Sequence, residues 1–315
     1  MANKAILLMG PTAVGKTSLV LQLSNYFPIE IVSVDSALIY RDLNIGSAKP
    51  NLDELSLVPH HLIDILSPLD NYSVANFLRD CNASIREINR RGKLPVLVGG
   101  TMMYFNALIN GISQLPESNP ELRQILENEF DHLGNRIMHD RLALLDPISA
   151  ARIAINDRQR IGRALEVYMI TGKPMSDAIK DHKLPGLIDC SYLSMAILPE
   201  NRSVLHKRIN ERFENMLKAG FIEEVIDLRQ KYPFLCSDHN SMRTVGYRQV
   251  WEYLEGKITR ESLSEQGMAA TRQLAKRQIT WLRSMDVITI DDENLDLIVL
   301  LQKVIELINH WQGVT

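Results

Sequence analysis

One eight-residue stretch near the amino terminus constrains this chain more than any other. Its residues are Gly10, Pro11, Thr12, Ala13, Val14, Gly15, Lys16 and Thr17, which match the pattern G-x-x-x-x-G-K-[ST]. An apolar run at residues 5–9 precedes the stretch, and a helix-like run at residues 18–23 follows it. This pattern between a strand and a helix is typical of a phosphate-binding loop, so the sequence predicts an α/β core.

The residue types of this loop explain how it could hold an anion. Its glycines allow successive backbone N–H groups to turn inward, and the following helix adds the partial positive charge of its amino terminus. Lys16 supplies a full positive charge, and Thr17 carries the hydroxyl that we expect to help hold Mg²⁺. The loop therefore predicts a phosphate or diphosphate site, or else a glycine-rich turn without chemistry. It does not say what happens to the phosphate.

The composition limits which partners the chain can have. Its 315 residues, 45% hydrophobic and 23% charged, allow one large or two modest domains. A net charge of −3 excludes a chain that is basic throughout, so any contact with nucleic acid needs local basic clusters. The three cysteines are far apart without a C-x-x-C spacing, which argues against a disulfide framework or a zinc site. With no apolar run of membrane-spanning length, we expect a cytoplasmic protein without membrane association.

Two further strand ends carry residues suited to chemistry. Residues 29–34 form an apolar run that predicts a strand, and Asp35 follows it directly. Its place beside the phosphate loop suits either an outer partner of a bound Mg²⁺ or a general base, and position alone favours neither. Residues 94–98 predict another strand, which is followed by Gly99, Gly100 and Thr101. These glycines indicate either close approach of a ligand or a plain tight turn. Residues 60–65 also resemble a strand.

The alternation of strands and helices stops near residue 115. Helical patterns cover residues 120–130, 135–145, 157–171 and 175–181, and strand character returns only at residues 192–197. We therefore predict a P-loop NTPase-like parallel sheet core flanked by helices, made of residues 1–114 and 188–315, with an all-helical insertion at residues 115–187. The arginines of the insertion indicate either a nucleic-acid contact or a solvated helix face.

A late helix, residues 270–283, carries a basic stripe. At about 100° per residue, Arg272, Lys276 and Arg283 fall within an arc of about 40°. Such a stripe suits a phosphate backbone, although an ordinary charged surface helix would look the same. We expect Trp281 of this helix to lie in the core.

Several blocks taken together are more specific than the phosphate loop. Besides residues 10–17 they are residues 34–40 (Val-Asp-Ser-Ala-Leu-Ile-Tyr), 97–105 (Leu-Val-Gly-Gly-Thr-Met-Met-Tyr-Phe), 163–167 (Arg-Ala-Leu-Glu-Val), 243–249 (Arg-Thr-Val-Gly-Tyr-Arg-Gln) and 271–283 (Thr-Arg-Gln-Leu-Ala-Lys-Arg-Gln-Ile-Thr-Trp-Leu-Arg). In this order, from about residue 4 to 285, the chain strongly resembles the tRNA dimethylallyltransferase (tRNA isopentenyltransferase) family, of the bacterial type.

The resemblance implies an activity and a set of residues. A dimethylallyl group would pass from its diphosphate to N6 of the adenosine just 3′ of the tRNA anticodon, with Mg²⁺ bound at Thr17. Asp35 would be the base that takes the N6 proton, Thr101 would lie beside it, and Arg208 would neutralise the departing diphosphate held by residues 10–17. Contacts with the tRNA anticodon stem-loop would come from Asp35, Ser36, Ala37, Leu38, Thr101, Arg123, Gln159, Arg160, Ile161, Gly162, Arg163, Ser241, Met242, Arg243, Thr244, Val245, Gly246, Gln273, Leu274, Ala275, Lys276, Arg277, Gln278, Ile279 and Thr280. Many members have Gln where this chain has Leu38.

Other activities use a similar loop. A small-molecule kinase would transfer the γ-phosphoryl group of ATP from it, and a prenyltransferase acting on free AMP or ADP would not need the late basic helix. A tRNA-binding protein without catalysis would have no use for the loop together with Asp35. Nothing in the sequence demands an oligomer, so we expect a monomer.

Overall fold

The computed structural model describes residues 3–181, 183–292, 294 and 296–313. The chain divides into two compact units, one made of Met1–Ile109 with Leu187–Thr315 and the other of Asn110–Gly186. Each unit is considered by itself.

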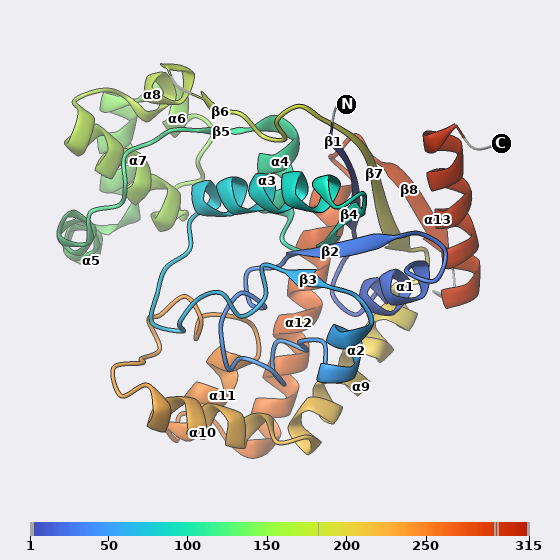
Figure 1. The fold of residues 1–315 in the computed structure, drawn as a ribbon. Coiled ribbons are helices and arrows are strands. Elements are labelled where there is room, and N and C mark those ends of the chain that lie inside the picture. The colour runs from blue at the N-terminus through green and yellow to red at the C-terminus, as the bar shows by residue number, and fades with distance from the viewer. Residues whose placement is uncertain (1–2, 182, 293, 295, 314–315) are drawn as a thin grey trace. The chain divides into compact units, whose positions relative to one another are not determined.

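A six-stranded parallel sheet is the centre of the first unit (Figure 1). Its strand order is β3-β2-β4-β1-β7-β8, and each neighbouring pair is parallel. The central strands are buried over most of their length, which explains why they are nearly continuous apolar runs in the sequence. The strands are β1 (Asn3–Met9), β2 (Ile29–Val34), β3 (His60–His61), β4 (Leu94–Gly99), β7 (Cys190–Pro199) and β8 (Ile288–Asp292).

Helices flank this sheet and extend beyond it. They are α1 (Lys16–Leu23), α2 (Leu52–Leu57), α3 (Val74–Arg90), α4 (Met102–Asn110), α9 (Arg202–Lys218), α10 (Phe221–Lys231), α11 (Tyr247–Leu254), α12 (Arg260–Leu282) and α13 (Leu297–Gln312). Helices α9 to α12 enclose an apolar cluster of their own that includes Phe213, Phe221, Tyr247 and Trp251. The loop before α2 adds Tyr40 and Leu43 to that cluster. The predicted α/β fold is confirmed.

The strand expected at residues 60–65 is wrong beyond its first two residues. Only His60–His61 pair with β2. Leu62 and Asp64 have positive φ values of 61° and 56°, which no strand accommodates. The chain turns there, and Lys49 forms an ion pair with the Asp64 carboxylate.

The second unit is mainly helical, with α5 (Pro120–Leu145), α6 (Pro147–Ala150), α7 (Arg158–Thr171) and α8 (Met175–Asp181). Gly134, with φ 80° and ψ 163°, interrupts α5 where the sequence predicts a break between two helices. The segment expected to be all-helical also contains the short strand β6 (Lys183–Leu184), which pairs in antiparallel fashion with β5 (Ile112–Ser113). Strands of two residues carry too little periodicity to be detected in a sequence.

Candidate active site

A cavity of about 880 Å³ lies in the first unit. The phosphate loop follows β1, Asp35 follows β2, and Gly99–Thr101 follow β4, and all three segments border the cavity. Because β1, β2 and β4 are parallel neighbours, their carboxyl ends meet at one edge of the sheet, where open α/β sheets bind ligands. Residues far apart in the sequence thus share one site.

Lys16 of the phosphate loop has a pKa that departs strongly from its ordinary value. Its ammonium donates to the carbonyl oxygens of Gly10 and Pro11, both at 2.8 Å. Burial lowers the pKa of Lys16 to about 7; the negative charge of Asp35 opposes this shift and the positive charge of Arg212 adds to it. A cation in this position is poorly solvated, so it gains from the approach of an anion.

Asp35 and Thr101 both line the cavity. The backbone N–H of Ala37 donates to Oδ1 of Asp35 at 2.8 Å, which orients the carboxylate. The N–H of Ser36 donates to Oγ1 of Thr101 at 3.1 Å, so the segments after β2 and β4 are joined next to that carboxylate. The carboxylate is therefore held by its own turn and is placed within electrostatic range of Lys16.

The two glycines before Thr101 are explained by packing. A Cβ on Gly99 would lie 1.9 Å from the carbonyl oxygen of Val34, and one on Gly100 would lie 2.4 Å from Nε2 of Gln278. Gly99 therefore requires glycine because a side chain would meet backbone, and a side chain at Gly100 would displace the amide of Gln278. These contacts account for the pair without a ligand.

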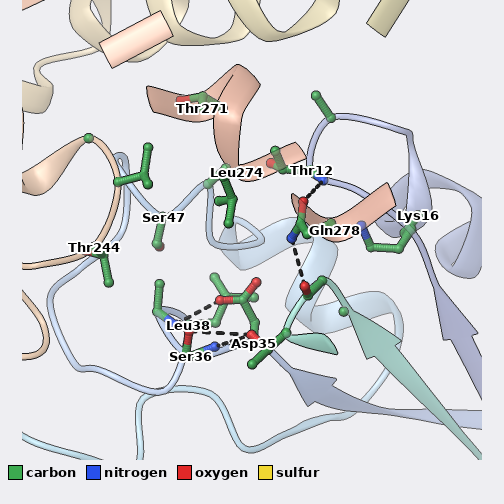
Figure 2. Close-up of a pocket in the computed structure, with 18 of the residues that line it drawn as sticks. Thr12, Lys16, Asp35, Ser36, Leu38, Ser47, Thr244, Thr271, Leu274 and Gln278 are labelled. Carbon is green, nitrogen blue, oxygen red and sulfur yellow. Dashed lines mark hydrogen bonds between the residues drawn. The ribbon is translucent and has the colours of Figure 1, made fainter. Parts of the chain in front are cut away.

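Gln278 fastens the loop to the sheet. From α12, its Oε1 accepts from the N–H of Thr12 at 2.9 Å, and its Nε2 donates to the carbonyl of Gly100 at 2.7 Å (Figure 2). The residue is 7% exposed. Sequence reasoning placed Gln278 only among the expected tRNA contacts. A sign of this structural role in the sequence is that Gln278 is polar although it lies on the apolar helix face formed by Ala275, Ile279 and Leu282.

A second arginine of α9 completes the charge around the cavity. Arg208 and Arg212 both line it, four residues apart on one helix face. Burial lowers the pKa of Arg212, and the negative charge of Asp35 opposes that shift. Within the described part of the chain, Arg212 has no ion-pair or hydrogen-bond partner. The sequence analysis gives a role to Arg208 and none to Arg212.

Comparison with known proteins identifies the family. The family model described as IPP transferase matches residues 38–285, and a second one, described as isopentenyl transferase, matches residues 3–65. The first match covers more than half of the chain. The chain belongs to the IPP transferase family.

Curated and solved members of the IPP transferase family resemble the chain over nearly its whole length. A tRNA dimethylallyltransferase of Chromobacterium violaceum is 54% identical over 91% of this chain and 88% of its own, and one of Neisseria meningitidis is 51% identical over 89% of each. A crystal structure of a tRNA isopentenylpyrophosphate transferase from Staphylococcus epidermidis has a TM-score of 0.67 at 32% identity, covering 98% of this chain and 99% of that one. A eukaryotic dimethylallyltransferase acting on tRNA has a TM-score of 0.74 at 28% identity, covering 92% and 74%.

The residues expected to contact tRNA divide into two groups in the first unit of this IPP transferase. One group lines the cavity and consists of Asp35, Ser36, Ala37, Leu38, Thr101, Arg243, Thr244, Val245, Gly246, Leu274, Arg277 and Gln278. The other group does not line it and consists of Ser241, Met242, Gln273, Ala275, Lys276, Ile279 and Thr280. Of these, Ser241, Met242, Ala275 and Ile279 are buried, so their side chains serve packing.

The basic stripe of α12 is not the face that borders the cavity. That face carries Leu274, Arg277 and Trp281, whereas Arg272 donates to Asn210 at 2.7 Å. The expectation that Trp281 lies in the core is wrong, because it is 39% exposed and lines the cavity. The helix turns its tryptophan toward the site because Leu282, the next residue, takes the buried position.

The remaining expected contacts lie in the second unit. Gln159 and Arg160 are exposed, Gly162 is half-buried, and Ile161 is fully buried in the core of that unit. Arg163 donates to Glu166 and to the carbonyl of Pro116, both at 2.6 Å, and Arg123 lies 3.5 Å from the same Glu166 carboxylate. These two guanidinium groups therefore neutralise a buried acid. Burial raises the pKa of Glu166, but hydrogen bonds from Arg163, the N–H of Asn119 and the hydroxyl of Ser118 hold it below its usual range.

A metal would have few protein ligands in this site. Within residues 3–181, 183–292, 294 and 296–313, no three His, Cys, Asp or Glu side chains gather as a metal cluster. Thr17 is exposed and lines the cavity. Mg²⁺ commonly keeps several waters and is held by one or two protein groups plus substrate phosphates, so this arrangement is compatible with it. None of the helices in the described part has the length and apolar character to span a bilayer.

Proposed function

We infer that this chain transfers the dimethylallyl group of dimethylallyl diphosphate to N6 of the adenosine 3′-adjacent to the anticodon of a tRNA, with release of diphosphate. The observation that carries the proposal is the single cavity into which a phosphate loop and a strand-end carboxylate both open. The names of the relatives, tRNA dimethylallyltransferases, support the same donor and acceptor.

The donor's diphosphate binds to the phosphate loop. Lys16 exchanges the carbonyls of Gly10 and Pro11 for diphosphate oxygens, and Arg208 and Arg212 approach from α9. Negative charge grows on the diphosphate as it leaves, so these cations stabilise the transition state more than the bound donor. Of the two arginines, Arg212 should be stabilised more by the bound diphosphate, because burial lowers its pKa and Lys16 lies near it.

The chemical step is a displacement at carbon. The bond between C1 of the dimethylallyl group and the diphosphate oxygen breaks, and the lone pair of the adenine N6 forms the new C1–N bond. The proton that N6 loses passes to Asp35, which its hydrogen bond from Ala37 holds in position. Thr101, joined to Ser36 beside this carboxylate, orients the amine. This arrangement favours the base over the metal-partner role for Asp35.

Mg²⁺ fits the site as a cation that the diphosphate oxygens coordinate. The hydroxyl of Thr17 would hold it, together with donor oxygens and water. When bound, it supplies further neutralisation of the leaving diphosphate.

The acceptor adenine reaches the cavity only after it leaves the base stack of the tRNA. The cavity walls near Asp35 are formed by residues 36–38 and by Arg243–Gly246. Leu274, Arg277 and Trp281 border the cavity from α12. Arg277 suits a phosphate of the flipped nucleotide, and Trp281 offers a stacking surface. Arg160 and Gln159, exposed in the second unit, suit contacts with the tRNA.

The proposal is tested with labelled donors. Undermodified tRNA is incubated with dimethylallyl diphosphate labelled in its carbon chain, and in parallel with ATP labelled at the γ-phosphate. We expect carbon label in N6 of one adenosine and no phosphate label. Free AMP, offered as a second acceptor, should remain unlabelled. Phosphate transfer, or labelling of AMP but not tRNA, would replace the proposal by a kinase or an adenylate prenyltransferase.

A further inference from the structure

The loop at residues 41–49 forms part of the cavity wall without being a helix or a strand. Gly46, Ser47 and Ala48 of this loop line the cavity. Asp42 and Ala48 have positive φ values of 65° and 51°, which residues other than glycine adopt at a cost. Such a conformation persists only where surrounding groups determine it, so the contacts of the loop with its neighbours decide the shape of this wall.

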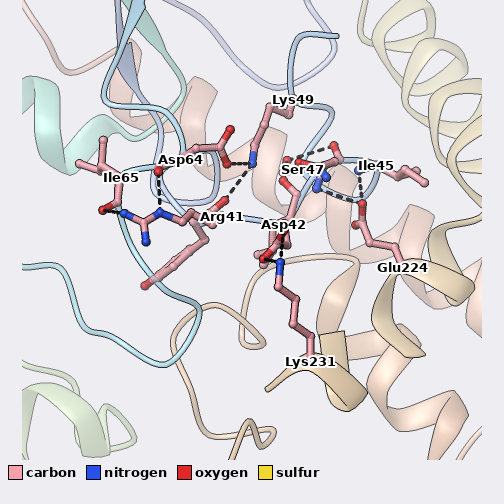
Figure 3. A network of polar contacts seen from close by, with 12 residues as sticks. Arg41, Asp42, Ile45, Ser47, Lys49, Asp64, Ile65, Glu224 and Lys231 are labelled. Atoms are coloured by element: carbon pink, nitrogen blue, oxygen red, sulfur yellow. Dashed lines mark hydrogen bonds and ion pairs between the residues drawn. The ribbon is translucent and has the colours of Figure 1, made fainter. Parts of the chain in front are cut away.

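One carboxylate binds the part of the loop that leads into the cavity wall, while Asp42 is held separately by Lys231 and Tyr232. Glu224, in the first turn of α10, accepts from three successive backbone N–H groups of the loop (Figure 3): Asn44 at 3.0 Å, Ile45 at 2.6 Å and Gly46 at 3.2 Å. Successive N–H groups that converge on one anion form a nest, here occupied by a side chain of the same protein. Gly46, the last of the three donors, lines the cavity together with the next two residues, Ser47 and Ala48.

The same carboxylate also binds the opposite part of the wall. The hydroxyl of Tyr247 donates to Oε1 of Glu224 at 2.6 Å. Burial and the charge of Glu224 raise the pKa of Tyr247, so this hydroxyl keeps its proton and donates at neutral pH. Tyr247 begins α11 directly after Thr244, Val245 and Gly246, which line the cavity. Glu224 therefore joins two wall segments that are about two hundred residues apart in the sequence.

The junction is closely packed. A Cβ on Gly46 would lie 2.0 Å from the ring of Phe221 and 2.8 Å from that of Tyr247. These two rings meet edge to face, with centroids 4.9 Å apart. Any movement of the loop away from Glu224 must disturb this contact, so the wall has one well-defined position.

The wall suits the nucleotide acceptor better than the diphosphate donor. Residues 46–48 and 244–246 carry no cationic side chain. Of these, Ser47 and Thr244 lie on the side of Leu38 and Ser36 (Figure 2). Lys16 lies on the other side of the view. Small residues and backbone groups allow a sugar or a base to approach closely, whereas a diphosphate is bound by cations.

We propose that Glu224 is a positioning residue for the tRNA acceptor: its carboxylate fixes residues 44–46 against the start of α11 and so sets the wall on which the flipped nucleotide is seated. The proposal rests on the proposed function for the identity of the acceptor.

The test compares three variants with the wild-type protein. Glu224→Gln keeps the size of the side chain but replaces one acceptor oxygen by an NH₂ group, which cannot accept from the loop. Tyr247→Phe leaves all three loop hydrogen bonds and removes only the link to α11. Glu223→Gln is the matched control, since Glu223 is the exposed neighbour on the same helix and borders no cavity. For each protein, tRNA affinity, inorganic diphosphate affinity and the KM for each substrate are measured, with thermal unfolding as the check on folding.

We expect Glu224→Gln to weaken tRNA binding and to raise the KM for tRNA about tenfold, while diphosphate affinity and the KM for the donor stay at wild-type values. Tyr247→Phe should weaken tRNA binding and raise the KM for tRNA by a smaller factor. If Glu224→Gln does not fold, Tyr247→Phe tests the proposal in its place. Glu223→Gln should behave as wild type. Unchanged tRNA constants in a folded Glu224→Gln protein, or equal weakening of both substrates, would overturn the proposal. A wild-type protein that transfers no five-carbon unit would instead refute the proposed function, because the binding measurements do not depend on turnover.

Discussion

Two cations face the cavity at a position where water solvates them poorly. Lys16 lies against backbone carbonyls with its pKa lowered to about 7, and Arg212 is buried near Asp35 without a direct partner among the described residues. Both are therefore sensitive to whether an anion is bound. This sensitivity leads to a measurable coupling between ligand binding and protonation.

Binding of diphosphate should draw a proton onto Lys16. Above pH 7 the ligand-free lysine is largely neutral, and a bound anion raises its pKa toward the ordinary value, so the complex holds more protons than the free protein. Affinity should consequently fall as the pH rises from 7 to about 9. Calorimetry with inorganic diphosphate, in two buffers of different ionisation enthalpy, gives the number of protons taken up. The Lys16→Met variant corrects for protonation of the diphosphate itself, and an equal uptake in both proteins would contradict this account of Lys16.

Removal of the base should separate chemistry from binding. Asp35→Asn keeps an oxygen that can accept from the N–H of Ala37 but cannot take a proton from N6. We expect the rate of a single turnover to fall by about 10²- to 10⁴-fold, with tRNA affinity close to wild type. Rapid-quench measurement of prenylated tRNA gives the rate, and fluorescence anisotropy gives the affinity. A full single-turnover rate would remove Asp35 from this role.

At the scale of elements, α12 connects the phosphate loop to the end of β4. Gln278 is the connecting residue, since it bonds Thr12 on one side and Gly100 on the other. The sequence predicts the end of this helix and its basic character, but α12 begins at Arg260, ten residues before the predicted start at residue 270. It does not predict this connection, because the partners of Gln278 are distant in the chain and only the packed fold brings them together.

Replacement of Gln278 by leucine should destabilise the protein by about 2 kcal/mol, since one N–H and one C=O lose their partners in a part-buried position. Gln273→Leu is the matched control, because Gln273 is exposed on the same helix and should change stability by less than about 0.5 kcal/mol. Urea unfolding of both variants measures the difference. Equal free energies of unfolding for Gln278→Leu and Gln273→Leu would mean that the two hydrogen bonds of Gln278 contribute nothing to stability.

The extent of prediction also differs between elements for physical reasons. The strands at residues 29–34 and 94–98 were predictable because both faces of a parallel sheet are buried and the runs are mainly apolar, with Glu30 and Ser33 the polar exceptions. Residues 60–65 also contain apolar residues, yet the positive φ values of Leu62 and Asp64 end that strand early. Trp281 looked like a core residue by type, and only the direction of α12 reveals that it borders the cavity.

At the scale of the whole molecule, a net charge of −3 must coexist with a polyanionic partner. The structure reconciles the two by local placement, since Arg243 and Arg277 border the cavity together with Arg208 and Arg212. The sequence suggested Arg272 and Lys276 for this purpose, but Arg272 is bonded to Asn210 and neither lines the cavity. Periodicity gives the faces of a helix correctly and cannot say which face meets the partner.

Loss of the Arg277 charge should therefore change the salt dependence of tRNA binding. If Arg277 contacts one phosphate, Arg277→Gln should reduce the slope of log K against log salt by about 0.7 to 0.9. Arg260→Gln removes an exposed arginine near the start of the same helix, outside the cavity lining, and should leave the slope unchanged. Titrations of tRNA at several salt concentrations provide the slopes. Identical slopes for Arg277→Gln and wild type would place this side chain away from the phosphate backbone.

The most direct test of the central claim is the product balance of a single turnover. With dimethylallyl diphosphate, undermodified tRNA and the wild-type protein, mass spectrometry of the digested tRNA counts five-carbon units on adenine N6, while an enzymatic assay counts the inorganic diphosphate released. The account predicts one diphosphate for each five-carbon unit, and no requirement for a nucleoside triphosphate. Consumption of a triphosphate, with no five-carbon unit on the RNA, would contradict it.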